Sequence, residues 1–166
     1  MELIIREACG SDAARLIETE RVCFPPNEAE KPENIMKRLV AAPELFLIAE
    51  DAADHRIAGF ICGVPTDEDA FRDEFFTDVG LIDFRGRNVI LLSLEVAPEY
   101  RGQGVAGRLM YALAERAKLG GKRKLILTCH EELISFYEGM GFAHNGRADS
   151  SWGGAEWQEM VKNIDK

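Results

Sequence analysis

The chain has 166 residues, 46% of them hydrophobic and 30% charged, which is typical of one globular domain spanning residues 1–166. Its apolar runs are short, and the N-terminal residues pass directly into a strand-like segment, so we expect neither a membrane span nor a signal peptide. The formal net charge of −9 argues against a nucleic-acid-binding surface; it is compatible with a cationic substrate, and also with solubility alone.

The N-terminal part is predicted to form a strand, two helices and a pair of strands. In the first strand, Leu3 and Ile5 alternate with charged neighbours. Ser11 is expected to cap the first helix, and Pro25 and Pro26 separate this helix from the second. The predicted ranges are 2–8 for the first strand, 28–41 for the second helix, and 44–51 and 57–64 for the paired strands.

Residues 65–87 form an acidic insert, which we expect to contain a short helix and a loop. Its acidic stretch carries the aromatic residues Phe71, Phe75 and Phe76. Two interpretations remain open: a lid whose carboxylates attract a cation, or core aromatics beside a solvated charged face, which is the commoner case. The carboxylates are Asp67, Glu68, Asp69, Asp73 and Glu74.

The C-terminal part alternates strands and helices. Residues 88–96 are a near-continuous apolar run ended by Pro98, as expected for a strand covered on both faces. With the next helix and strand they form a strand–helix–strand unit, for which we expect a right-handed crossover and parallel strands. The full order predicts an α/β (α+β) fold, with a mixed, mostly antiparallel sheet of about seven strands and helices on both faces. The remaining predicted ranges are 104–118 and 131–140 for helices, and 124–129, 142–147 and 155–161 for strands.

The four cysteines are scattered, with no C-x-x-C pair and no His-rich neighbourhood; they are Cys9, Cys23, Cys62 and Cys129. This spacing argues against a zinc site and against a disulfide scaffold. We therefore expect reduced thiols in a cytoplasmic protein that holds no metal.

A glycine-rich turn joins the strand at 88–96 to the helix at 104–118. Gly102 and Gly104 permit close backbone approach, and the first N–H groups of the helix point to one spot. Together with the helix dipole and the charge of Arg101, these groups form an anion site. The turn lacks the Lys-Ser/Thr of a P-loop, which argues against a nucleoside triphosphate with Mg²⁺.

The segment Arg101-Gly102-Gln103-Gly104-Val105-Ala106 resembles the pyrophosphate loop of the GNAT superfamily of N-acetyltransferases. The preceding residues 94–98 look like that family's central strand, in which a bulge exposes backbone groups to the pantetheine arm. Residues 136–142 are similar to the family's Tyr-Glu-x-x-Gly-Phe signature. The resemblance implies a GNAT-like fold with acetyl-CoA as acyl donor and no metal. The residues that it implies for cofactor binding are Leu94, Glu95, Val96, Arg101, Gly102, Gln103, Gly104, Val105, Ala106, His130 and Phe136.

A narrower resemblance links residues 23–27, 42–45 and 129–137 to the arylalkylamine (serotonin) N-acetyltransferase branch, in which the Pro-containing loop helps to form the acceptor wall. Vertebrate members of that branch carry a His-x-His pair on the central strand, and this chain has Ile90 and Leu92 at those positions. The resemblance therefore does not extend to a proton relay through histidines.

Acyl transfer to an amine requires a base for the ammonium proton and an acid for the leaving thiolate. Tyr137 is our candidate acid, and a core tyrosine is the alternative. Glu95 is our candidate base; in the alternative, its side chain turns to solvent or pairs with an arginine. His130 is expected to touch the pantetheine or the acceptor, unless it is a surface histidine.

Residues 152–157 are predicted to form a hairpin whose two aromatics, Trp152 and Trp157, either line the acceptor pocket or complete the core, and the core is favoured. The leading function is acetyl transfer from acetyl-CoA to the primary amine of a small molecule, arylalkylamine- or polyamine-like, by direct attack in a ternary complex. The alternatives are a protein N-terminal or lysine acetyltransferase and a non-catalytic acyl-CoA sensor. We expect neither a nucleic-acid nor a membrane partner, and folds of this kind are often homodimers.

Overall fold

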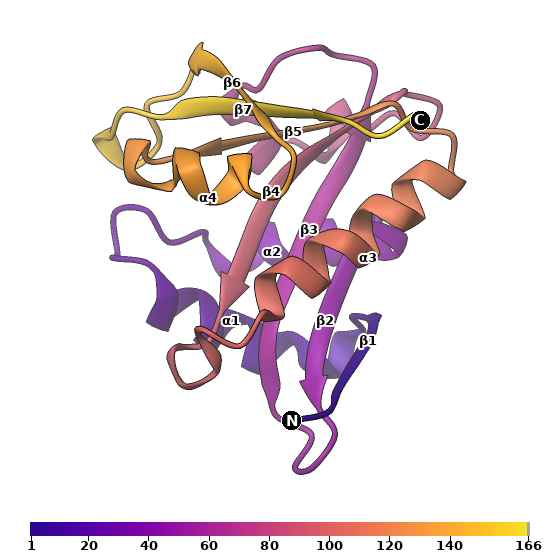
Figure 1. The fold of residues 1–166 in the computed structure, drawn as a ribbon, viewed down its shortest axis with the longest axis vertical. Helices are drawn as coiled ribbons and strands as arrows, with labels where there is room; N and C mark the ends of the chain where they lie inside the picture. The colour runs from indigo at the N-terminus through magenta and orange to yellow at the C-terminus, as the bar shows by residue number, and fades with distance from the viewer. Residues whose placement is uncertain (166) are drawn as a thin grey trace.

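The computed structural model describes residues 1–165, which form a seven-stranded sheet with the order β1-β2-β3-β4-β5-β7-β6 (Figure 1). Neighbouring strands are antiparallel except β4 and β5, which are parallel. The predicted mixed, mostly antiparallel sheet and its parallel strand–helix–strand unit are therefore confirmed. The strands are β1 (Leu3–Glu7), β2 (Phe46–Asp51), β3 (Ile57–Thr66), β4 (Asn88–Val96), β5 (Lys124–Cys129), β6 (Ala143–Arg147) and β7 (Gln158–Asn163).

Four helices cover the two faces of the sheet, as predicted. The helices α1 (Ala13–Cys23) and α2 (Pro32–Ala41) lie on one face, and α3 (Val105–Leu119) and α4 (Ile134–Glu138) lie on the other (Figure 1). None of the helices in residues 1–165 has the length and apolar character that a bilayer crossing requires.

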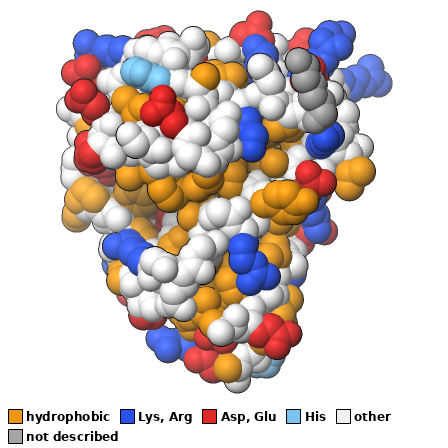
Figure 2. Space-filling model, viewed as in Figure 1, with side chains coloured by type: hydrophobic (Ala, Val, Ile, Leu, Met, Phe, Trp, Pro, Cys, Tyr) orange, Lys and Arg blue, Asp and Glu red, His pale blue; other side chains and the backbone are white. Residues whose placement is uncertain are grey.

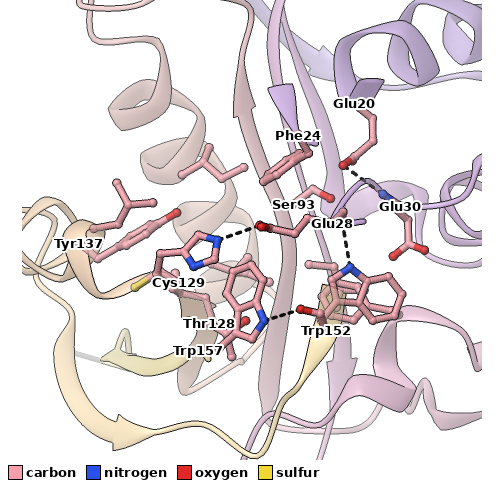
Figure 3. A pocket seen from close by; sticks show the side chains of 17 residues that line it. Glu20, Phe24, Glu28, Glu30, Ser93, Thr128, Cys129, Tyr137, Trp152 and Trp157 are labelled. Atoms are coloured by element: carbon pink, nitrogen blue, oxygen red, sulfur yellow. Dashed lines mark hydrogen bonds and ion pairs between the residues drawn. The ribbon is translucent and has the colours of Figure 1, made fainter. Parts of the chain in front are cut away.

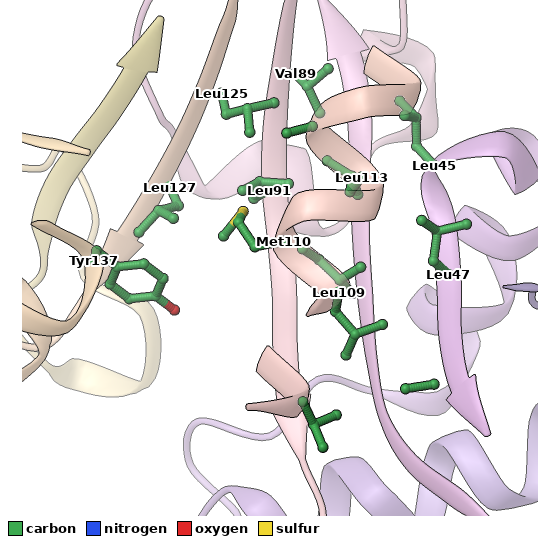
Figure 4. Close-up of a cluster of buried hydrophobic side chains, with 14 of the residues drawn as sticks. Leu45, Leu47, Val89, Leu91, Leu109, Met110, Leu113, Leu125, Leu127 and Tyr137 are labelled. Atoms are coloured by element: carbon green, nitrogen blue, oxygen red, sulfur yellow. The ribbon is translucent and has the colours of Figure 1, made fainter. Parts of the chain in front are cut away.

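The larger core lies between α3 and the sheet. Leu109 and Leu113, one helical turn apart on α3, pack toward Leu91 of β4 and Leu127 of β5 (Figure 4). All four are at most 5% exposed. This apolar stripe at helical spacing fixes α3 across β3 and β4 and so sets the position of its N-terminus.

Local deviations from the predicted elements have identifiable causes. Ser11 does not cap α1, because residues Gly10–Asp12 form a 3₁₀ turn in which Asp12 accepts the Cys9 N–H at 2.9 Å and pairs with Arg6. The second helix begins at Pro32, which is well suited to the first helical position, rather than at residue 28. Residues 152–154 form a 3₁₀ turn, so β7 begins at residue 158.

The insert at 65–87 contains two 3₁₀ turns, Asp73–Phe76 and Val79–Leu81, and no α-helix. Phe71 and Phe75 are buried against Ile90 and Ile126, so these two aromatics belong to the core. Several of its carboxylates have partners within the chain, such as Glu68 with Arg72 and Asp69 with Lys124. These contacts favour the charged surface over a cation-attracting lid.

Candidate active site

The central strands β4 and β5 diverge at the level of Ile90. They pair only between Asn88–Ile90 and Lys124–Ile126, although β5 continues to pair with β7 as far as Cys129. On its other side, β4 bulges at Leu92, since Cys62 of β3 pairs with Ser93 and the adjacent Gly63 pairs with Leu91. The backbone of β4 beyond Ile90 is thus free of strand partners on the β5 side.

The turn after β4 brings the N-terminus of α3 to this opening. Gly102 and Gly104 have positive φ values of 75° and 80°, and Gly104 is the N-cap residue of α3. A Cβ atom placed on either glycine, or on Gly107, would meet no heavy atom within 4 Å. The space in front of the helix N-terminus is therefore open to an anionic ligand.

An apolar cleft, here called the cofactor cleft, runs from this turn along β4 to α4. Every residue implied for cofactor binding lines it except Gln103 and His130. Figure 2 shows apolar side chains gathered between α4 and the N-terminal part of α3, where the cleft opens. These residues fit a pantetheine arm along β4 and a pyrophosphate at the turn.

Arg101 closes the turn back onto β4. Its Nε donates a hydrogen bond to the Val96 carbonyl at 3.1 Å, and its Nη2 lies 3.7 Å from Cys23 Sγ of α1. The guanidinium remains exposed at the mouth of the cofactor cleft. Gln103 is also exposed, and its side-chain amide donates to the Glu99 carbonyl at 3.4 Å.

A second cavity, here called the acceptor pocket, adjoins the cofactor cleft. Phe24, Leu94, Leu133 and Tyr137 line both cavities. The acceptor pocket is lined by residues of the α3-side core, such as Leu127, and by α1-side residues, such as Glu20. It therefore passes through the opening between β4 and β5, from one face of the sheet to the other.

Tyr137 lies where the two cavities meet. It is 8% exposed and packs edge-on against Phe136 and Phe142, with ring centroids 5.1 and 5.8 Å away. Its hydroxyl points into the acceptor pocket (Figure 3) and makes no hydrogen bond with another residue in the described range 1–165. Burial, with a smaller contribution from Cys129, raises the pKa of this hydroxyl, so it is protonated at neutral pH. A protonated, oriented hydroxyl is what a general acid requires.

Glu95 faces α1 instead of the solvent. It is 3% exposed, and neither of its carboxyl oxygens has a hydrogen-bond partner within residues 1–165. The alternative of a solvated or arginine-paired side chain is therefore wrong. Burial is the main factor that raises the pKa of Glu95 well above its ordinary value, and the neighbouring Glu20 carboxyl is the next. Glu95 lines the cofactor cleft but is absent from the lining of the acceptor pocket, where Glu20 is present.

His130 belongs to the acceptor pocket and not to the cofactor cleft. Its ring stacks on Trp157 with centroids 4.1 Å apart, and its Nε2 lies 2.7 Å from Glu28 Oε1. Trp152 also lines the pocket, and its indole N–H donates to the Glu28 carbonyl at 2.9 Å. Both tryptophans thus line the pocket, and Trp157 is also buried as the favoured core interpretation expected.

Sequence reasoning did not single out Glu20 or Glu28 as pocket residues, and it left Phe76 open between a lid and the core. Glu20 lies near the end of a helix that carries several charged residues, and such residues are most often solvated. Glu28 and Phe76 reach the pocket only through contacts between segments distant in the chain. Within residues 1–165, no group of three or more His, Cys, Asp or Glu side chains could hold a metal ion.

A splayed central strand, an open helix N-terminus and a pocket that joins the cofactor cleft together form a site suited to acyl-CoA. The model of the acetyltransferase (GNAT) family matches residues 13–142, and the chain belongs to this family. The resemblance to the GNAT superfamily that the sequence indicated is therefore confirmed.

Among characterised relatives, a mycothiol acetyltransferase of Paenarthrobacter aurescens (strain TC1) is 40% identical over 72 residues, which are 43% of this chain and 22% of that protein. The chain therefore matches less than a quarter of that relative's length.

Solved structures resemble nearly the whole chain. The loading GNATL domain of CurA from Lyngbya majuscula has a TM-score of 0.84 at 18% identity, covering 99% of this chain and 98% of that one. The PaiA N-acetyltransferase from Thermoplasma acidophilum in complex with coenzyme A has a TM-score of 0.73 at 21% identity, covering 98% and 99%. At these identities the likeness shows the fold alone.

Proposed function

We propose that this enzyme transfers the acetyl group of acetyl-CoA to the primary amine of a small molecule, arylalkylamine- or polyamine-like, by direct attack in a ternary complex. The observation that carries the proposal is the acceptor pocket, which meets the cofactor cleft at Tyr137 and has an aromatic wall. Such an enclosed, aromatic cavity suits a small apolar body with a single polar reacting end.

The roles of the residues follow from their places. The N–H groups at the start of α3 and the Arg101 guanidinium would hold the pyrophosphate. The backbone of Leu94–Val96 has no strand partner on its β5-facing side and would align the pantetheine arm there. An N–C bond forms and the thioester C–S bond breaks. The acceptor ammonium loses two protons in all, one to a base and one that ends on the thiol. Tyr137 is the proposed donor to the leaving thiolate.

For the base we propose Glu95, a buried carboxyl that lines the cofactor cleft together with Tyr137 and whose pKa is raised. Glu95→Gln should then remove one limb of the pH profile of kcat/KM, since a proton acceptor has been replaced by an amide. An intact profile would assign the proton to water or to another residue.

The second candidate is acetylation of a protein N-terminus or lysine. It needs a groove that admits an extended peptide, whereas residues 27–28 and 152–153 meet across this side of the acceptor pocket through the Asn27–Gly153 and Trp152–Glu28 hydrogen bonds. This contact between the two segments favours a small-molecule acceptor over an extended peptide. A non-catalytic acyl-CoA sensor is less favoured, because Tyr137 is oriented as an acid would be.

The direct test is a screen for CoA release with arylalkylamines, polyamines, amino-acid amides and short peptides at a fixed acetyl-CoA concentration. We expect turnover with small amines and little with peptides of the same terminal amine. Turnover confined to peptides would select the protein acetyltransferase, and acetyl-CoA binding without any turnover would select the sensor.

A further inference from the structure

Three buried carboxyl groups and one guanidinium form a cluster at the α1 and α2 end of the acceptor pocket. Glu20, Glu30 and Glu95 are 3%, 7% and 3% exposed, and Arg38 is 2% exposed. Arg38 forms an ion pair with Glu30, which also accepts a hydrogen bond from Asn34 at 2.8 Å. The guanidinium is thus paired with Glu30, and neither Glu20 nor Glu95 forms an ion pair with any Lys or Arg in residues 1–165.

The carboxyl oxygens of Glu20 and Glu95 lack donors. Glu20 Oε2 accepts the Glu30 N–H at 3.2 Å, whereas Glu20 Oε1 and both oxygens of Glu95 have no partner among the described residues. Burying such oxygens without a donor is unfavourable. Burial raises the pKa of Glu95, so this carboxyl keeps its proton to a higher pH than usual and can donate it toward Glu20. Within residues 1–165 no Lys or Arg is paired with Glu20, and the Nε of Arg38, which pairs with Glu30 through its Nη2, also has no partner.

A cation can reach the pair through the acceptor pocket. Glu20 and Glu30 line the pocket, and Glu28, the third carboxyl in its wall, is engaged with His130. Figure 3 shows Glu20 on the side of the pocket opposite Tyr137, with Phe24 and Ser93 between them. A molecule in the pocket therefore meets the proposed acid at one end and an unpaired carboxylate at the other.

We infer that the acceptor is a diamine, one amine of which is acetylated beside Tyr137 while the second, as an ammonium, is held by Glu20 with Glu95 behind it. The inference rests on the proposed function, whose acceptor class it narrows. An ammonium brings three donors to the unpartnered oxygens. The aromatic and aliphatic wall between the two ends, which includes Phe76, Leu92 and Trp152, suits an alkyl spacer and tolerates a nearby cation. An acceptor carrying a carboxylate at that end is repelled.

For a diamine, Glu95 is a positioning residue that donates a hydrogen bond to Glu20. When the acceptor has no second ammonium group, Glu95 keeps its proposed role as the base. Glu95→Gln keeps a donor beside Glu20, so the preference for diamines should survive this change, whereas Glu20→Gln should abolish it.

The test compares putrescine and cadaverine with n-pentylamine, a monoamine of the same length as cadaverine, using kcat/KM from CoA release. In the native enzyme the diamines should be preferred, and Glu20→Gln should lower their kcat/KM roughly 10- to 100-fold while changing that of n-pentylamine little, because a charged hydrogen bond is lost. The matched control is Glu18→Gln, which removes the same charge from an exposed position on the same helix, where the side chain is 59% exposed. It should leave all three substrates unchanged.

Calorimetry with cadaverine in the presence of CoA separates the two proposals. Amine turnover without a preference for diamines, or an equal loss for all three amines in Glu20→Gln, would overturn the diamine inference and leave the proposed function standing. Absence of turnover with every amine, together with cadaverine binding that depends on Glu20, would overturn the proposed function and keep the cation site. Circular dichroism of each variant checks that it folds. If Glu20→Gln does not fold, Glu95→Gln serves as the second variant. Loss of the preference for diamines in Glu95→Gln would contradict the inference.

Discussion

At Tyr137, the chemical role of the hydroxyl can be tested separately from the packing of the ring. Tyr137→Phe keeps the ring against Phe136 and Phe142 and removes only the hydroxyl, which has no partner within residues 1–165. If the hydroxyl protonates the leaving thiolate, kcat should fall by about 10²-fold or more, while acetyl-CoA affinity measured by calorimetry stays the same. Tyr111→Phe, a change on the exposed side of α3, is the control. Unchanged turnover in Tyr137→Phe would remove this residue from the mechanism.

The raised pKa of Glu95 leads to a prediction about stability that does not depend on catalysis. Its folded-state pKa lies above the ordinary value of 4.5 because the carboxyl is buried beside Glu20, so the folded state binds more protons than the unfolded state. The free energy of unfolding should therefore decrease as pH rises from about 4.5 to the raised pKa, with a slope of at most about 1.4 kcal/mol per pH unit. Below the ordinary pKa this loss is absent.

Glu95→Gln should remove this slope and stabilise the protein at pH 8, since an amide does not ionise. Urea unfolding at a series of pH values measures the effect, with Glu18→Gln as the exposed control. Parallel pH dependences in the native protein and in Glu95→Gln would show that Glu95 does not titrate abnormally.

At the scale of elements, the N-terminus of α3 is the feature on which cofactor binding depends. Gly104 has a φ of 80°, and a side chain there would project into open space at the cofactor cleft. Gly104→Asp should weaken acetyl-CoA binding strongly, because a carboxylate would stand beside the pyrophosphate where the helix dipole favours the anion. Asp and Asn both tolerate a positive φ, so Gly104→Asn carries nearly the same backbone strain and size without the charge.

Calorimetric titration of both variants isolates the charge. We expect roughly tenfold weaker binding for Gly104→Asp than for Gly104→Asn, and a salt-dependent difference between them. Equal affinities would mean that the pyrophosphate does not lie at this turn.

At the scale of the whole molecule, the sequence predicted the parts of the site that lie on continuous segments. β4 and β5 have the predicted bounds because their apolar runs are nearly continuous, and the turn before α3 is marked by its own glycines. The acceptor pocket was less accessible to prediction, since its wall combines Glu20, Phe76 and Trp152 from segments that meet only in the fold. The family resemblance implied a bulge near residues 94–98, but its observed position at Leu92 depends on the β3 register, which no local pattern encodes.

The acceptor pocket also depends on one long-range contact, between residues 27–28 and residues 152–153. The Asn27 side-chain amide donates to the Gly153 carbonyl at 3.0 Å, and a Cβ atom on Gly153 would lie 2.6 Å from the Asn27 carbonyl oxygen. Gly153→Ala should therefore push the two segments apart, open the aromatic wall and raise KM for the amine, with acetyl-CoA affinity unchanged.

Gly154→Ala is the matched control for that prediction. Gly153 and Gly154 have φ values of 65° and 75°, so alanine costs roughly 1–2 kcal/mol of backbone strain at either position. Only Gly153 adds the clash, because a Cβ on Gly154 would meet nothing within 4 Å. Steady-state kinetics should show a raised KM for the amine in Gly153→Ala alone. An equal KM in the two variants would mean that backbone strain in the β6–β7 connection, and not its contact with residues 27–28, determines the shape of the acceptor pocket.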